Sequence, residues 1–74
     1  MFLDLVRNEL EKSRLKHGDI LSAHEGLGII LEEFEEFKDE VKKRNHDHEL
    51  MVAELVQIAA MAAKIAEDVC GVKP

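Results

Sequence analysis

The chain contains 74 residues with a net charge of −6, and 46% of its residues are hydrophobic while 4% are aromatic. A chain of this length forms a single domain over residues 1–74 with a small aliphatic core, and domains below about 70–80 residues often gain stability by assembling with other copies. The single cysteine, Cys70, excludes an intramolecular disulfide and fits a reducing compartment. Without a membrane-spanning apolar run or the pattern of a signal peptide, the sequence predicts a soluble cytoplasmic protein with no membrane partner.

The first predicted element is a helix over residues 2–16, because apolar residues recur there at helical spacing among charged ones. Its apolar stripe consists of Phe2, Leu3, Val6 and Leu10, with Leu5 beside it. Gly18 follows, and glycine readily adopts the left-handed conformation that closes many helices. The one proline is the last residue and no segment alternates like a strand, so we expect an all-α fold.

A second helix is predicted from Ser22 to about Arg44. Ser22 and Glu25 have the spacing of a capping box, in which the serine hydroxyl accepts from the Glu25 backbone N–H and the Glu25 carboxylate accepts from the Ser22 backbone N–H. The apolar face of this helix contains seven residues at helical spacing: Ala23, Leu27, Ile30, Leu31, Phe34, Phe37 and Val41.

The third helix is predicted from about His48 to Cys70, after a short connection in which Asn45 closes the second helix and Asp47 caps the third. Because the connection is short, the two helices should form a long antiparallel hairpin. The third helix is apolar nearly all round, which is typical of a buried helix. Three helices in one chain cannot cover both of its sides, so we expect a helical-bundle homodimer or a tetramer.

An acidic segment over residues 32–40 carries six acids and one lysine and accounts for most of the negative charge. A negative field of this kind attracts cations and repels nucleic acid, so no nucleic-acid partner is expected. Glu33 and Glu36 are three residues apart and therefore lie on one side of the helix. Further acids extend this surface: Glu25, Glu32 and Glu40. Taken alone, the pattern is more typical of a solvated helix face.

Glu54 lies inside the apolar third helix, where a glutamate is rarely buried unless it is paired or binds a metal. Carboxylates brought together from two facing helices repel one another, and a hard divalent cation such as Mg2+ removes that repulsion. We therefore predict a metal site at Glu33, Glu36 and Glu54. The alternative is an ion pair between Glu54 and a lysine or arginine of the first helix, such as Arg7 or Arg14.

This glutamate pattern resembles the signature of the MazG-like proteins, a compact branch of the all-α NTP pyrophosphohydrolases. That signature has E-E-x-x-E on one helix and E-x-x-D on the next, and four residues of this chain match it: Glu32, Glu33, Glu36 and Glu54. The residues around the motif, at 22–26 and 54–62, are also similar to this branch, and the resemblance covers roughly residues 20–70.

The resemblance implies cleavage of a nucleoside triphosphate between its α- and β-phosphates, giving a monophosphate and pyrophosphate, with Mg2+ as cofactor and Mn2+ as an alternative. It implies that Glu33, Glu36 and Glu54 bind the metal and that Glu32 and Glu33 take part in catalysis. Glu32 would position water or a second metal ion. The aspartate of the signature is replaced by Gln57, whose amide oxygen can bind Mg2+ but carries no charge.

Two further residues are candidate substrate contacts. Lys64 lies seven residues after Gln57 on the same side of the helix and is a candidate phosphate contact, although a lysine extending into solvent is an equal alternative. His24 is a candidate contact to base or phosphate, with a hydrogen-bonded buried histidine as the alternative. Because Gln57 weakens the match to the signature, a second hypothesis stays open: a catalytically weak or inactive helical module for oligomerisation or binding.

Overall fold

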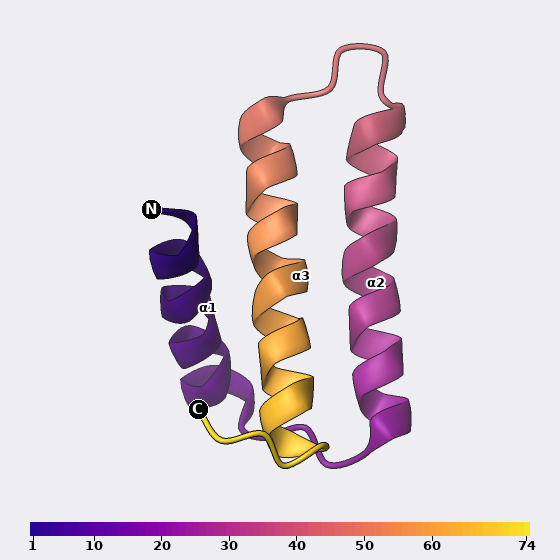
Figure 1. Cartoon of the computed structure of the whole chain (residues 1–74). Helices are drawn as coiled ribbons and strands as arrows, with labels where there is room; N and C mark the ends of the chain where they lie inside the picture. Colours follow the sequence, from indigo (N-terminus) through magenta and orange to yellow (C-terminus); the bar gives the residue numbers. More distant parts are fainter.

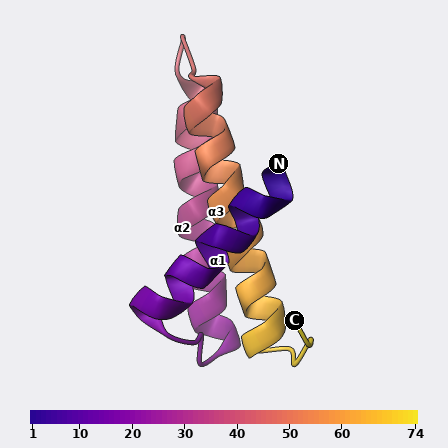
Figure 2. The ribbon, with the colours of Figure 1, turned by 90° about the vertical axis from the view of Figure 1, so that its left-hand side faces the viewer.

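The computed structural model describes all 74 residues and contains three α-helices and no strand. These are α1 (Phe2–His17), α2 (Ala23–Lys42) and α3 (His48–Asp68), so the all-α prediction is confirmed. Figure 1 shows α3 between the other two helices, with α2 beside it and running in the opposite direction. Figure 2 shows that α1 crosses the α2–α3 pair obliquely. Both outer helices contact α3, whereas the backbones of α1 and α2 stay apart.

At the start of α2, one of the two hydrogen bonds of the predicted capping box is present. The Ser22 hydroxyl accepts a hydrogen bond from the Glu25 backbone N–H at 3.1 Å, as expected. The Glu25 carboxylate, however, accepts from the Leu21 backbone N–H at 2.8 Å and not from Ser22. The backbone of Ser22 is extended, with φ −151° and ψ 159°, and the preceding N–H is the donor within reach of the carboxylate. Both bonds satisfy backbone donors near the start of the helix.

The connection between α2 and α3 is built around Glu40. This residue was expected to belong to the acidic surface, but it is buried. Its carboxylate accepts from Lys43 Nζ at 2.8 Å and from the Asp47 backbone N–H at 3.0 Å. These contacts turn the chain directly after α2, which therefore ends at Lys42 and not at Arg44. The Asp47 side chain then accepts from the backbone N–H groups at the start of α3, which confirms the predicted cap.

The apolar core is small. Four apolar residues are buried, three of them from α3: Ile20, Val56, Ala60 and Met61. Helix α2 approaches α3 closely at Gly26, where an added Cβ would lie 3.0 Å from Ile65 Cγ1. Helix α3 ends at Asp68, two residues before the predicted Cys70, and the following chain turns at Gly71, whose φ is +76°.

Polar contacts hold α1 against α3 near the C-terminal end of both helices. Arg14 forms ion pairs with Glu67 at 2.7 Å and with Asp68 at 2.8 Å. Asp68 also accepts from the Ile20 backbone N–H at 2.8 Å, which fixes the loop after α1. Burial alone would raise the pKa of Asp68, but the hydrogen bonds from Ile20 and Arg14 hold it below its usual value. The C-terminal part of α1 is therefore anchored through charged groups.

Large apolar side chains remain exposed on all three helices. On α2, Leu27, Leu31 and Phe34 are 55%, 49% and 51% exposed. Two of the four apolar residues predicted to pack from α1, Phe2 and Leu3, are also exposed to solvent. The other two, Val6 and Leu10, are half-buried. Several apolar residues of α3 remain exposed as well: Leu50, Val52 and Leu55. None of the helices combines the length and the apolar character needed to span a membrane.

Candidate metal centre and adjoining pocket

The structure brings together the three glutamates that the sequence suggested as metal ligands. Glu33 and Glu36 are one turn apart on α2, and Glu54 approaches them from α3. Each offers one carboxylate oxygen, and the three oxygens all lie within 4.8 Å of one another. Glu33 and Glu54 are half-buried between the helices, whereas Glu36 is exposed. We call these three residues the glutamate cluster.

Two oxygens of the glutamate cluster lack hydrogen-bond partners. Glu33 Oε2 and Glu54 Oε2 are both buried, and neither accepts a hydrogen bond. A buried polar atom without a partner costs roughly 1–3 kcal/mol, and more if it carries charge. The oxygen atoms of these two side chains are therefore placed where a bound cation would stabilise them.

The surroundings of the cluster disfavour negative charge. Burial raises the pKa of Glu33 to about 7, and the charges of Glu36, Glu54 and Glu32 act in the same direction. Burial also raises the pKa of Glu54. A hydrogen bond between the carboxyl groups of Glu54 and Glu36 and the negative charge of Glu36 raise it further. A divalent cation favours the ionised form of each carboxylate and opposes these shifts. A cation bound near neutral pH would therefore favour release of the proton from Glu33.

The alternative ion pair for Glu54 is wrong. Arg7 pairs with Asp4 at 3.6 Å on the surface of α1. Arg14 is engaged by Glu67 and Asp68 and also contacts Asp19 at 3.0 Å. Both arginines thus have acidic partners elsewhere, and no lysine, arginine or histidine forms an ion pair with Glu54.

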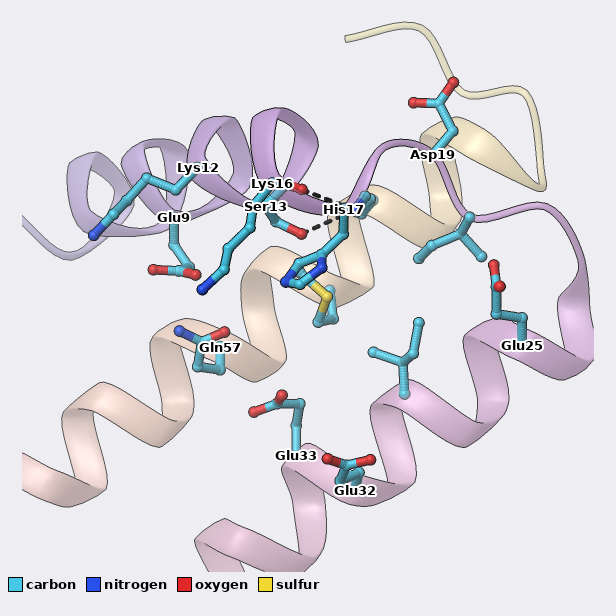
Figure 3. Close-up of a pocket in the computed structure, with 14 residues that line it drawn as sticks. Glu9, Lys12, Ser13, Lys16, His17, Asp19, Glu25, Glu32, Glu33 and Gln57 are labelled. Atoms are coloured by element: carbon cyan, nitrogen blue, oxygen red, sulfur yellow. Dashed lines mark hydrogen bonds between the residues drawn. The ribbon is translucent and has the colours of Figure 1, made fainter.

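A pocket of about 520 Å³ adjoins the cluster, and Glu33 belongs to both. It lies between α1 and α2, with α3 as its floor (Figure 3). The residues contributed by α1 include Glu9, Lys12, Lys16 and His17. Its volume falls within the roughly 300–1,000 Å³ that is usual for small-molecule sites.

The other predicted site residues differ in their relation to this pocket. Glu32 and Gln57 line it, from α2 and α3 respectively. Lys64 also lines it, but this lysine is 3% exposed and not on the surface. Its ammonium group donates to Ser13 Oγ at 2.8 Å, so it contributes to holding α1 in place. His24 is exposed and lies outside the pocket, so the buried-histidine alternative is wrong.

Three lining residues of α1 belong to no motif that is recognisable in the sequence: Glu9, Lys12 and Lys16. The spacing of the two lysines, four residues apart, places them on one face of a helix. Arg7 and Glu11 have the same spacing on another part of α1, however, so the pattern alone does not select the face that borders the pocket. The information that selects it lies in the contacts between Arg14 or Ser13 and α3, more than 50 residues away along the chain.

The combined site has carboxylates that suit a hard cation beside a pocket large enough for a small molecule. Comparison with family models, curated proteins and solved structures finds no match for this chain. The function is therefore inferred from the geometry and chemistry of the glutamate cluster and the pocket.

Proposed function

We propose that this protein is a MazG-like nucleotide pyrophosphohydrolase that uses Mg2+, or alternatively Mn2+, to cleave a nucleoside triphosphate into a monophosphate and pyrophosphate. The observation that supports this proposal most is the glutamate cluster, with three carboxylate oxygens within 4.8 Å of one another. Two of its residues carry buried oxygens that accept no hydrogen bond, which is costly unless a cation or a proton is present.

Glu33, Glu36 and Glu54 would hold the metal. When bound, Mg2+ supplies a Lewis acid that polarises phosphate oxygens and lowers the pKa of water. Glu36 is exposed, so the cluster stays open on one side to water and phosphate groups. Glu32 lines the pocket next to Glu33 and is suited to orient the attacking water and accept its proton. Gln57 adds a neutral amide oxygen at the edge of the same pocket.

The two proposed substrate contacts are supported unequally. Lys64 lines the pocket, and its positive charge favours a phosphate group there even while the ammonium donates to Ser13. His24 is exposed and is not a lining residue. Of the two, Lys64 is therefore the better supported.

We also propose that the protein acts as a homodimer or as a dimer of dimers. Apolar residues exposed on α2, including Leu27, Leu31 and Phe34, would be covered by a second copy. The small core of the single chain supports the same proposal, because domains of this size often need assembly for stability. A second chain would also cover exposed apolar residues of α3.

A second candidate function is that of a catalytically weak or inactive helical module. Gln57 favours it, because an amide replaces a charged ligand and should weaken metal binding. The exposed apolar surface of α2 is equally consistent with a role limited to assembly.

Pyrophosphate release from a panel of NTPs and dNTPs, in Mg2+, in Mn2+ and in EDTA, tests the enzyme proposal. We expect release only with a divalent metal, and its loss in Glu33→Gln. Glu35→Gln is the matched control, because Glu35 is an exposed neighbour outside the cluster and the pocket. Release that is unchanged by EDTA or by Glu33→Gln would contradict the metal mechanism. Metal-dependent stabilisation without hydrolysis of any nucleotide would favour the second candidate.

A further inference from the structure

The pocket beside the glutamate cluster has walls of opposite charge. Helix α1 contributes Lys12, Lys16 and His17, and helix α2 contributes Glu32 and Glu33. Figure 3 shows Lys16 and His17 extending from α1 into the space above α3, while Glu33 extends into it from α2. Because the backbones of α1 and α2 stay apart, the two walls face each other across the pocket.

These charged walls are not neutralised within the chain. Neither lysine forms an ion pair, and neither Glu32 nor Glu33 forms one. Glu9 of α1 also forms no ion pair, whereas three other charged residues of the pocket are engaged. Asp19 pairs with Arg14, Glu25 accepts from Leu21, and Lys64 donates to Ser13. The free charges of the pocket are therefore two lysines and one glutamate on α1, and two glutamates on α2.

This division limits the chemistry of a ligand that would fill the pocket. A free anion attracted by Lys12 and Lys16 would be repelled by Glu33 and by Glu9, which lies on the same wall as the lysines. A free cation at the glutamate cluster would leave the lysines without partners. A polyphosphate that chelates a divalent cation carries both charges, and a pocket of about 520 Å³ has room for a small molecule of this kind.

We propose that α1 forms an anion-binding wall, in which Lys12 and Lys16 bind the phosphate chain of a di- or triphosphate whose cation is held by the glutamate cluster. His17 adds a donor at the end of this wall. The proposal rests on the metal site proposed above and deepens it, because it assigns the phosphate contacts to residues outside the glutamate motif. It also makes anion binding depend on the cation, since the cation neutralises the carboxylates that face the lysines.

Calorimetric titration with inorganic pyrophosphate tests the wall without any nucleotide or hydrolysis. The proteins are the wild type, the double variant Lys12→Ala/Lys16→Ala and the control Lys42→Ala, whose lysine is exposed at the end of α2 and outside the pocket. Each is titrated in Mg2+ and in EDTA, and each is also titrated with Mg2+ alone. Both pocket lysines are exposed, so the double variant should fold, and its melting curve checks this.

We expect pyrophosphate to bind the wild type and Lys42→Ala in Mg2+ and to bind neither in EDTA. The double variant should bind it about 10–100-fold more weakly, because it lacks two charge-assisted contacts to phosphate. Its affinity for Mg2+ alone should not fall. Tripolyphosphate and a nucleoside triphosphate with a non-hydrolysable α,β bridge should lose affinity by a similar factor, because the lysines contact the phosphate chain that both share.

Two results would contradict the proposal that Lys12 and Lys16 bind the phosphate chain. In the first, the double variant binds pyrophosphate as tightly as the wild type does in Mg2+. In the second, the wild type binds pyrophosphate as tightly in EDTA as it does in Mg2+. A loss confined to the nucleotide analogue would also contradict it, because the lysines would then contact the nucleoside. Failure of the proposed metal site is recognised separately, as a wild type that does not bind Mg2+ alone.

Discussion

A carboxylate oxygen of Glu54 on α3 lies within 4.8 Å of one from Glu33 on α2, and each residue has a buried Oε2 that accepts no hydrogen bond. The two residues approach each other across a helix interface whose other buried contributions from α3 are mostly apolar. In the absence of a cation, the chain lowers the cost of this arrangement by binding protons. The raised pKa values of Glu33 and Glu54 therefore link the stability of the fold to pH.

The stability of the metal-free protein should fall as the pH rises from about 5 to 8. The pKa of Glu33 is about 7 in the fold, compared with 4.5 for a free glutamate. Between these values the folded state binds more protons than the unfolded state, so the free energy of unfolding decreases with pH. The lowered pKa values of Asp68 and Glu40 act on the acid side of this range. Melting curves in EDTA should show this decrease, and Mg2+ should reduce it. A Tm in EDTA that is constant from pH 5 to 8 would contradict the shift at Glu33.

Replacing Glu54 by glutamine should separate stability from metal binding. In EDTA at pH 8 the variant should be as stable as the wild type, or more stable by about 1 kcal/mol, because a buried charge without a partner is removed. The rise in Tm caused by millimolar Mg2+ should disappear. Glu35→Gln also removes one negative charge, but from an exposed residue outside the cluster, and this variant should keep the rise in Tm with Mg2+. A Glu54→Gln protein that melts far lower in EDTA and still responds to Mg2+ would exclude the metal site.

Arg14 should be the most important arginine for stability. Arg14→Ala leaves Asp68 buried without its ion-pair partner and also removes the contact to Glu67, so we expect a loss of about 2–3 kcal/mol. Arg7→Ala is the control, because Arg7 and Asp4 form an exposed pair of the kind that contributes about 0–1 kcal/mol. Chemical denaturation measures both variants. Equal losses would show that α1 is not anchored through Arg14.

Two glycines of α2 should respond in opposite ways to alanine. In Gly28→Ala the new Cβ meets no atom within 4 Å, so the helix should gain about 0.5–1 kcal/mol from a better helix former. In Gly26→Ala the Cβ would lie 3.0 Å from Ile65 Cγ1, and overpacking of this kind costs about 1–3 kcal/mol. Denaturation curves should therefore place Gly28→Ala above Gly26→Ala in stability. The reverse order would mean that α2 and α3 are less closely packed at Gly26.

The proposed assembly can be tested on the exposed face of α2. The wild type should sediment as a dimer or tetramer at micromolar concentration, and Leu31→Glu or Phe34→Glu should shift it toward the monomer because a charge replaces an apolar contact. Leu15→Glu introduces the same charge at a residue of α1 that is 91% exposed and should leave the assembly intact. A wild type that sediments as a monomer of 8.4 kDa would contradict this proposal.

Local sequence patterns predicted the three helices and the caps at the starts of α2 and α3, because these depend on residues close together in the chain, but they placed the ends of α2 and α3 two residues too late. Ser22 and Asp47 cap the helices that follow them, as the spacing of their neighbours suggested. The proximity of the three glutamates was also predictable. A glutamate inside an apolar helix is rarely buried unless it is paired or binds a metal, and the facing helix carries further carboxylates that could share such a metal. The direct evidence for this placement is the proximity of Glu33, Glu36 and Glu54.

The burial of Glu40 and of Lys64 was not predicted from the sequence. Glu40 belongs to the same acidic run as Glu33, yet it is buried because the chain folds back onto it at Asp47. Lys64 is buried because Ser13 of α1 offers an acceptor for its ammonium group. The burial of Lys64 depends on a contact 51 residues away in the chain, whereas that of Glu40 depends on the conformation of the turn between α2 and α3, which places Lys43 and Asp47 against its carboxylate.

The attachment of α1 to α3 affects the order in which the chain folds. The hydrogen bonds from Arg14 to Glu67 and from Lys64 to Ser13 join residues more than 50 positions apart, whereas a short turn connects α2 to α3. Closing the longer loop costs more entropy, so the α2–α3 pair should form first and α1 should dock last. Amide hydrogens of α1 should accordingly exchange faster than those of α3. Since all three cluster glutamates belong to the early pair, undocking of α1 would remove the lysines from the pocket and leave the carboxylates assembled.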